Sequence, residues 1–566
     1  MTRQILIGFR DVFEGEEMLD LKSYLKGISR KTLIDVATYL LANAPLTVEG
    51  YCRLCLGESN SDFARLLVNF LSTRSGRFKA DEYVVVSVTT GLKLYELAVE
   101  TSEADSDTLT HGQIEIAITK TVLAINQTEI DAQDKLSVGS DDEKPIAPKM
   151  MLAAMSPYHS TINCSLIDEL VAQTHNALCL FKFLEQNYSA LLTEFLKTKG
   201  ITHWHSYISG LYGYVYPILK HLKSGYSTIV TFKSDDEYSS NLQFIESLSH
   251  QSIDSHYDFQ PLRARPFYFD RERREIRPIL SVFVIDMLFK GLYFQLKDIN
   301  ERLGIIPDLK STIGTDFTEQ VLFNSVMKSI FGRRFLQRTE SQMVDTERQD
   351  YGNPDFYVRN GNKVYIFEIK DALIRADVLN SYDYNEIEKE LKFKLFQNKK
   401  GTPKGIRQLI NNIKGLFSGY YEWDKGAKVN KIRIHPVLVF TDRSLTLPAA
   451  NVVLNEWFYD QLKEEISEDE LTRVAPLVTV SLNSLFIHSQ YLSIGNNFES
   501  ALKSFYPRFN IKQYLANVRS LETAQRKYME ECMMSFDMYL NLINPMSIMD
   551  KWNIIKPELT IFMSIE

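Results

Sequence analysis

Residues suited to metal-assisted hydrolysis lie close together in the stretch DYGNPDFYVRNGNKVYIFEIKDA, residues 350–372. Asp355 and Glu368 carry the carboxylate oxygens that hard divalent cations such as Mg²⁺ prefer as ligands. Lys370 follows Glu368 by two residues, so its ammonium group could stabilise negative charge that develops beside the cation. Together the three side chains suit a reaction in which a metal ion activates a water molecule.

A β-hairpin is the element that must bring these side chains together. Two runs rich in aromatic and β-branched residues flank Asn360-Gly361, a dipeptide favoured in two-residue hairpin turns. A turn at that dipeptide places Asp355 opposite Ile366 and makes Asp355 and Glu368 diagonal neighbours, with Cβ atoms about 7 Å or less apart. Because side chains alternate between the faces of a strand, one face is predicted to carry Asp355, Ile366, Glu368 and Lys370.

A third carboxylate is predicted to face the same sheet from a helix. Apolar residues recur at helical spacing over residues 316–331, and Glu319 falls in the middle of their stripe. The alternative is that Glu319 closes a capping box with Asp316, three residues earlier. The position in the stripe favours the first interpretation, because a capping glutamate does not need to lie there.

These residues resemble the signature of the PD-(D/E)XK nucleases, a superfamily with a restriction-endonuclease-like core. The signature is a helix with Glu, a strand with Pro-Asp, and a following strand with Asp or Glu, any residue and then Lys. Here these are Glu319, Pro354-Asp355 and Glu368-Ile369-Lys370, in the same order. The resemblance covers about residues 312–490 and does not extend to the first 300 residues.

The resemblance implies a role for each residue of the signature. Asp355, Glu368 and the carbonyl oxygen of Ile369 would hold Mg²⁺, or Mn²⁺ in its place. Glu319 would reach the metal directly or through water. Lys370 would position the attacking water and stabilise the developing negative charge.

The helix predicted over residues 401–417 also resembles the helix that follows the motif in this superfamily. Its inward face is apolar, and its outward face carries Lys404, Gln408 and Asn411. These three residues are the predicted contacts to a nucleic-acid backbone.

The function that the resemblance implies is metal-dependent hydrolysis of phosphodiester bonds, in DNA rather than RNA and by an endonuclease rather than an exonuclease. By analogy it also suggests a bacterial anti-phage defence or restriction effector, controlled by an activating protein partner or by self-association. The alternative is a catalytically silent relative that serves as a nucleic-acid-binding or assembly subunit. Fold analogy alone does not separate the two.

The net charge of −8, from 64 Lys and Arg against 72 Asp and Glu, argues at first against a nucleic-acid partner. The charge is unevenly distributed, however. Residues 389–433 contain 12 basic and three acidic residues, immediately after the predicted metal site. Phosphate binding needs only such a local patch, although a solvated helix face is the alternative interpretation.

The predicted fold class is α/β (α+β), in a chain whose 566 residues suggest two to four domains. Residues 1–305 are predicted to be a mostly helical regulatory region, with a possible strand at 82–90 and an acidic connection at about 100–148. Residues 306–490 are predicted to form the nuclease domain, with a central mixed sheet flanked by helices. Residues 491–566 are predicted to be a helical extension packed on that domain.

The cysteines and the hydropathy pattern favour a cytoplasmic protein that has no contact with a membrane. Five scattered cysteines do not form a disulfide framework, and no apolar run reaches the ~20 residues of a membrane span. Cys52 and Cys55 have the spacing of half a zinc ribbon, but no second pair follows them. We therefore interpret them as thiols on a helix.

Overall fold

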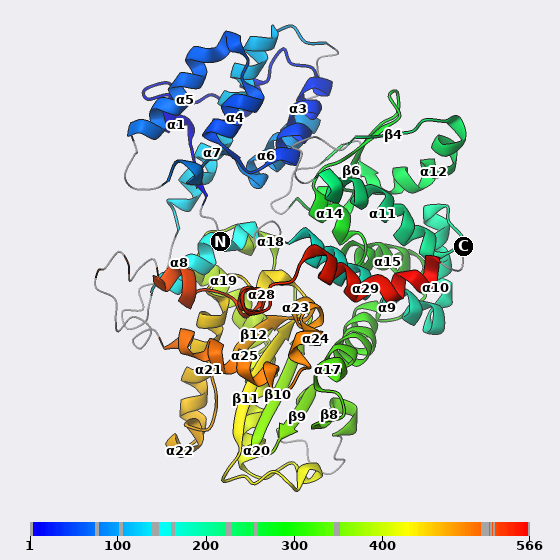
Figure 1. Ribbon diagram of the computed structural model, residues 1–566, viewed down its shortest axis with the longest axis vertical. Coiled ribbons are helices and arrows are strands. Elements are labelled where there is room, and N and C mark those ends of the chain that lie inside the picture. The colour runs from blue at the N-terminus through cyan, green and yellow to red at the C-terminus, as the bar shows by residue number, and fades with distance from the viewer. Residues whose placement is uncertain are drawn as a thin grey trace. The chain divides into compact units, whose positions relative to one another are not determined.

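A computed structural model describes the chain in two compact units (Figure 1). The first unit comprises Met1–Lys135, Thr161–Leu166 and Leu184–Ile305, and the second comprises Leu136–Ser160, Ile167–Phe183 and Ile306–Glu566. Two segments from the N-terminal part of the chain therefore belong to the second unit. The residues described are 4–73, 79–100, 106–136, 146–159, 165–221, 229–250, 252–253, 259–343, 351–510, 520, 523 and 527–563.

The first unit combines helices with two small sheets. One sheet has the strand order β1-β3-β2, with β1 Ile5–Leu6, β3 Tyr83–Val86 and β2 Leu46–Thr47. The other has the order β4-β7-β6-β5, with β4 Val230–Thr231, β7 Glu275–Pro278, β6 Phe267–Asp270 and β5 Ser249–His250. The strand expected at 82–90 is thus shorter than expected, because helix α6 begins at Val88.

Helices make up most of the rest of the first unit. They are α1 Phe9–Val12, α2 Leu21–Tyr24, α3 Arg30–Asn43, α4 Val48–Cys55, α5 Ser61–Thr73, α6 Val88–Glu100, α7 His111–Gln133, α10 Ser189–Lys199, α11 Trp204–His221, α12 Asp235–Leu248, α13 Gln260–Ala264, α14 Ser281–Asp286 and α15 Lys290–Leu303.

The acidic connection expected at about 100–148 is wrong over its central part. That part is the helix α7, whose Val122, Leu123 and Ala124 are completely buried. Apolar residues within the helix pack into the core of the unit, although acidic sequence flanks the helix on both sides. The flanking stretches 101–105 and 137–145 lie outside the described residues.

The second unit is built on a five-stranded mixed sheet with the order β12-β11-β10-β9-β8. Its strands are β8 Leu336–Thr339, β9 Phe356–Asn360, β10 Lys363–Lys370, β11 Arg433–Phe440 and β12 Val478–Ser481. β10, β11 and β12 are parallel, whereas β9 is antiparallel to both β10 and β8. The predicted α/β or α+β class, with a mixed sheet flanked by helices, is confirmed.

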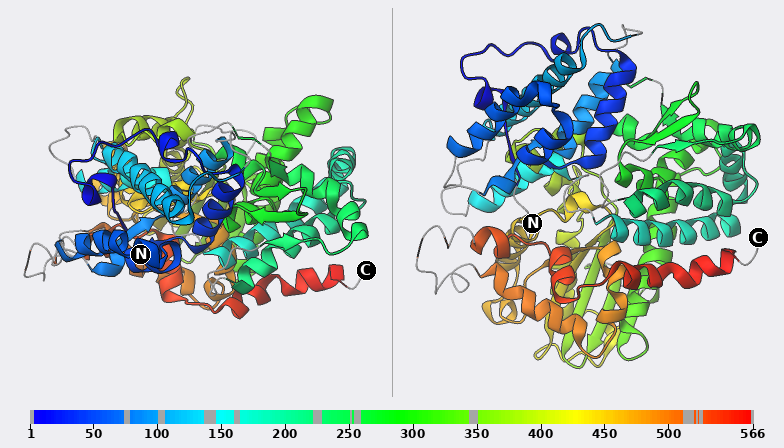
Figure 2. Two further views of the ribbon diagram at one scale, coloured as in Figure 1. Left: turned by 90° about the horizontal axis from the view of Figure 1, so that it is seen from above. Right: turned by 45° about the horizontal axis from the view of Figure 1, so that its top comes forward.

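Helices cover both faces of this sheet, as the turned views of its green and yellow strands show (Figure 2). On one face, Phe331 of α17 contacts the rings of Tyr365 and Phe367 on β10. On the other face, Gly405 precedes α20 and lies against Lys370. β10 is consequently buried along almost its whole length.

The remaining helices of the second unit come from three separate parts of the chain. They are α8 Ile146–Met155, α9 Leu166–Asn187, α16 Leu309–Ser311, the π-helix η4 Thr312–Phe323, α17 Asn324–Phe331, α18 Ala376–Leu379, α19 Tyr384–Leu395, α20 Ile406–Phe417, α21 Ala450–Glu465, α22 Glu468–Leu471, α23 Leu482–Ile487, α24 Ser489–Leu492, α25 Asn497–Phe505, α28 Phe536–Ile543 and α29 Ile548–Met563. Within the described ranges, no helix combines the length and the hydropathy that crossing a membrane requires.

The hairpin of β9 and β10 has a different register from the one that the sequence suggested. Asn360 pairs with Lys363, so Gly361 and Asn362 form the turn, and Gly361 adopts a positive φ of 63°. The predicted pairing was wrong by two residues, and the observed register carried one residue beyond β9 places Asp355 opposite Glu368. Because side chains alternate with a period of two, this shift leaves both residues on the predicted face.

Candidate metal centre

Glu319 lies within the π-helix η4 and is half-buried next to the sheet. The capping alternative is wrong, because the helical turns start well before Asp316. Asp308 caps them instead, accepting a hydrogen bond from the N–H of Ser311 at 3.0 Å. Buried neighbours on both sides of Glu319, Phe317 and Leu322, hold this stretch against the core. π-Helical turns are rare and occur frequently at functional sites.

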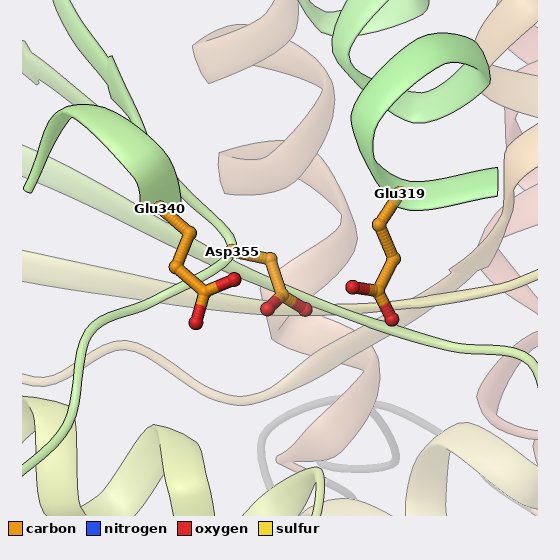
Figure 3. Close-up of side chains that lie close together, drawn as sticks. All are labelled: Glu319, Glu340 and Asp355. Carbon is orange, nitrogen blue, oxygen red and sulfur yellow. The ribbon is translucent and has the colours of Figure 1, made fainter. Parts of the chain in front are cut away.

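Three carboxylates from separate elements meet beside the sheet. One oxygen each of Glu319, Glu340 and Asp355 lies within 4.8 Å of the other two. Figure 3 shows the three side chains pointing toward one another, with Asp355 between the two glutamates. Among the described residues this is the one group of three or more His, Cys, Asp or Glu side chains with such spacing.

Glu340 is the member of this cluster that the sequence did not suggest. It begins the short helical turn Glu340–Gln342, directly after β8. Its backbone N–H donates to the carbonyl oxygen of Asp355 at 3.1 Å. The only signal for Glu340 is the pairing of β8 with β9. Thr339 lies opposite Phe356 in this antiparallel pair, so Glu340, the residue after Thr339, lies beside Asp355, the residue before Phe356.

The carboxylate of Asp355 is fixed by the edge of β10. The N–H of Ile369 donates to Oδ2 of Asp355 at 2.6 Å, just beyond the point where the pairing of β9 with β10 ends. The N–H and the carbonyl of one strand residue point toward the same neighbour. The carbonyl oxygen of Ile369 therefore faces the edge at which Asp355 lies, and its metal-binding role stays a prediction.

Glu368 is completely buried and lies next to Asp355, but it is not one of the three clustered carboxylates. Its Oε1 accepts a hydrogen bond from Nζ of Lys370 at 2.8 Å. Its Oε2 has no hydrogen-bond partner among the described residues. A buried carboxylate oxygen without a partner is costly, and protonation or a bound cation would each reduce that cost.

Burial and mutual repulsion raise the pKa values of these acids. Burial raises the pKa of Glu319 to about 7, and the neighbouring Asp355 carboxylate adds to the shift. The pKa values of Glu340, Asp355 and Glu368 are raised too, each chiefly by burial. Burial lowers the pKa of Lys370, but the carboxylates of Glu368 and Asp355 more than offset this effect and keep the group charged.

A divalent cation bound by oxygen fits this arrangement. All of the clustered donors are carboxylate oxygens, which match Mg²⁺ or Mn²⁺ better than they match Zn²⁺. An acidic cluster alone does not establish a metal site. The buried Oε2 of Glu368, unpartnered among the described residues, lies next to the cluster and could serve as a further oxygen ligand.

The three predicted nucleic-acid contacts have different surroundings in the structure. The Oε1 of Gln408 accepts a hydrogen bond from the N–H of Gly405 at 2.8 Å, so this amide caps the start of α20. Nζ of Lys404 lies 5.7 Å from the centre of the Phe393 ring, and Asn411 is half-buried. Gln408 thus has a structural role that the sequence did not suggest.

Two exposed lysines project from a short hairpin that directly precedes Gly405. Backbone hydrogen bonds join the N–H of Asn398 to the carbonyl of Thr402 at 3.1 Å and the N–H of Lys404 to that of Phe396 at 2.9 Å. We call residues 396–404 the lysine hairpin, because Lys399 and Lys400 form its tip. In the part of the chain that the structure describes, neither tip lysine has an acidic partner within ion-pair distance.

Other basic side chains of the segment 389–433 are engaged within the protein. Arg407 and Lys414 both pair with Glu465, and Lys392 pairs with Glu388 at 2.9 Å. The local excess of positive charge is therefore only partly available to a ligand.

Comparison with known proteins does not assign this arrangement to a family. No protein-family model matches the sequence. No curated protein matches it either.

Proposed function

We propose that this protein is a metal-dependent phosphodiesterase that cleaves nucleic acid. One observation carries the proposal: three clustered carboxylates lie beside a buried Glu368 that has one unpartnered oxygen and a lysine on the other. An acidic site of this kind would bind a divalent cation, and a cationic lysine facing the same site would bind the phosphate of a substrate.

Asp355, Glu319 and Glu340 would hold the cation, with the unpartnered oxygen of Glu368 and the Ile369 carbonyl as further donors. A bound Mg²⁺ supplies Lewis acidity, which lowers the pKa of a water ligand and neutralises charge on a phosphoryl oxygen. The N–H of Ile369 keeps the Asp355 carboxylate oriented toward the cluster. Glu368 holds Nζ of Lys370 at the site, where the ammonium positions the attacking water and stabilises the negative charge of the transition state.

Nucleic acid is the substrate class that the surroundings of the site support best. The lysine hairpin presents two exposed, consecutive lysines without an acidic partner among the described residues, and it leads directly into Gly405, which lies against Lys370. Such cations contact phosphates without reading bases. A preference for DNA, an endonuclease mode, and a role as a bacterial anti-phage or restriction effector follow from the family resemblance alone, and we propose them on that basis.

The rival proposal is a catalytically silent protein that binds nucleic acid. Every position of the motif is occupied by a residue able to act, and Lys370 stays paired and charged, which supports catalysis over silence.

The test is incubation of the full chain with supercoiled plasmid, linear duplex and single-stranded RNA in Mg²⁺, Mn²⁺ or EDTA. Asp355→Asn and Lys370→Gln serve as inactive variants, and Glu468→Gln, an exposed acid on α22, serves as the control. We expect metal-dependent nicking by wild type and control only. Equal nicking by all variants would contradict the proposal that these residues are catalytic. Metal-dependent binding of nucleic acid without cleavage by any of the proteins would contradict the proposal that the protein is an enzyme.

A further inference from the structure

A thiol, an imidazole and a carboxylate form a connected set away from the metal centre. Cys179 and His175 lie one turn apart on α9, with 3.7 Å between Sγ of the cysteine and Nε2 of the histidine. Nδ1 of His175 lies 3.1 Å from Oε1 of Glu558, which α29 supplies. A nucleophile, a base and a group that orients the base are the three parts of an activated thiol.

The imidazole ring is held in this position from several sides. It stacks on Phe486 of α23, with ring centres 3.9 Å apart and planes 14° from parallel. A second ion pair, between Lys551 and Asp168 at 2.5 Å, also joins α29 to α9. With Nδ1 hydrogen-bonded to the carboxylate, Nε2 is the ring nitrogen that remains to face the thiol.

The electrostatics of the set favour a charged imidazole. Burial lowers the pKa of His175, but the neighbouring sulfur and the Glu558 carboxylate outweigh burial and raise it to about 9. The group facing the ring from α23 is uncharged Phe486, so Glu558 and Cys179 are the ionisable groups that act on it. A cationic imidazole beside a thiol favours the thiolate, which is the reactive form of cysteine.

A neighbouring imidazole distinguishes Cys179 from Cys52 and Cys55, the other free cysteines that the structure describes. The side chain of Cys179 is half-buried rather than fully enclosed. Cys52 and Cys55 on α4 are also half-buried, but burial raises the pKa of both thiols, to about 12 for Cys55. The two α4 cysteines therefore provide an internal comparison within the same chain.

The position of Cys179 argues against acyl-transfer chemistry. It lies in the interior of α9, where backbone N–H groups donate to carbonyls of the preceding turn. An acyl-transfer site needs free donors beside the nucleophile to stabilise an oxyanion. Oxidation of the sulfur has no such requirement.

We propose that Cys179 is a redox-sensitive thiol that reacts with hydroperoxides, with His175 as its base and Glu558 as a positioning residue. The thiolate sulfur attacks the terminal peroxide oxygen, so that an S–O bond forms while the O–O bond breaks. The leaving oxygen takes the proton from the His175 imidazolium and departs as water or an alcohol. The sulfur is oxidised by two electrons to a sulfenic acid, and the peroxide is reduced by two electrons.

The first test measures alkylation of each cysteine of the full-length protein by iodoacetamide at pH 7, with mass spectrometry of the peptides. We expect Cys179 to react about tenfold faster than Cys52 and Cys55, because the adjacent His175 imidazole can accept the thiol proton and the thiolate is the form that attacks. His175→Gln should remove this advantage. Glu558→Gln should reduce it, and Glu558→Asp should restore most of it.

The second test exposes the same proteins to hydrogen peroxide and traps sulfenic acid with a carbon nucleophile specific for it. Trapping should occur first at Cys179, and Cys179→Ser is the blank. Circular dichroism checks that each variant is folded. If His175→Gln fails to fold, the Glu558 pair still decides the matter. Equal rates at Cys179, Cys52 and Cys55, or a Cys179 rate that is the same in wild type and in both Gln variants, overturns the proposal.

Discussion

Nζ of Lys370 lies 2.8 Å from Oε1 of Glu368, two residues back on the same face of β10. The acid is completely buried and the lysine nearly so, since 19% of the lysine side chain is exposed. Neither charge is stable there without the other, because an isolated ion in the interior loses its hydration. The pair therefore fixes the position of the ammonium group beside the three clustered carboxylates.

Removing Lys370 alone should destabilise the protein more than removing both members of the pair. In Lys370→Met, the buried Glu368 must either take up a proton or stay charged without a partner. Breaking a buried pair in this way should lower the free energy of unfolding by about 3–5 kcal/mol. The double variant Glu368→Gln, Lys370→Met should recover most of that loss without recovering activity. Denaturant unfolding of wild type, the two single variants and the double variant measures the coupling energy. If the stability losses of the two single variants add up to that of the double variant, the coupling is contradicted.

Asp355→Asn should abolish the stabilisation that Mg²⁺ provides. The asparagine keeps an oxygen that accepts from the N–H of Ile369, so the hairpin should survive while the negative charge is lost. We expect Mg²⁺ to raise the melting temperature of wild type but not of the variant. The nicking rate of the variant should fall by at least roughly 10–100-fold, the loss that is typical when a residue supporting a metal ligand is removed. Equal shifts with Mg²⁺ in both proteins would exclude Asp355 as a ligand.

Glu340→Gln tests the carboxylate that only the structure revealed. If Glu340 holds the cation, the variant should bind Mg²⁺ or Mn²⁺ more weakly and cleave at least about tenfold more slowly at limiting metal, with partial recovery at high metal. Glu468→Gln removes an exposed acid of α22 and should change neither property. Isothermal titration and cleavage across a metal series provide the readouts. Wild-type affinity in Glu340→Gln would remove it from the site.

Charge reversal at the tip of the lysine hairpin should weaken binding of nucleic acid without altering metal affinity. Losing two phosphate contacts should reduce the slope of log K against log salt by about 1.8 for duplex DNA. Lys399→Glu with Lys400→Glu is compared with Lys26→Glu and Lys79→Glu, exposed lysines of the first unit with the same charge change. Fluorescence anisotropy in Ca²⁺ measures binding, and equal slopes for the two double variants would count against the hairpin.

A buried histidine on β11 should make folding stability sensitive to acid. Burial lowers the pKa of His435 to about 4, from an ordinary value of 6.5, and its ring stacks against Tyr365 and Tyr506. The unfolded chain binds the proton more readily, so the histidine costs no stability above pH 6.5 and about 3 kcal/mol as pH falls toward 4. Thermal melts from pH 7.5 to 4.5 should fall more steeply for wild type than for His435→Gln. Parallel curves would contradict this linkage.

The shared face of Asp355 and Glu368 could be predicted from the sequence because it depends on a period of two and on nothing finer. The register itself could not be predicted, since Asn360-Gly361 and the neighbouring Gly361-Asn362 both suit a tight turn. The carboxylate of Glu340 escaped because it lies in an ordinary polar stretch and joins the site only through the pairing of β8 with β9.

The fold class was predictable in the second unit, where strands and helices are long enough to show their periods. The small sheets of the first unit were not, because strands of two residues such as β1 and β4 leave no alternation to detect. Helix α7 was hidden by the acidic sequence on both sides of it. Gln408 was predicted to contact nucleic acid because the sequence does not distinguish an amide that caps a helix from an exposed amide.

The alternation of side chains along β9 and β10 also limits how the turn between these strands can change in length among related sequences. A change in turn length that slides one strand past the other by an even number of residues leaves Asp355 and Glu368 facing the same way, whereas an odd slide sends one of them to the opposite face. Descendants of this chain should therefore tolerate paired insertions and deletions near Gly361 and lose the site with single ones, so the length of this turn should vary among them in steps of two.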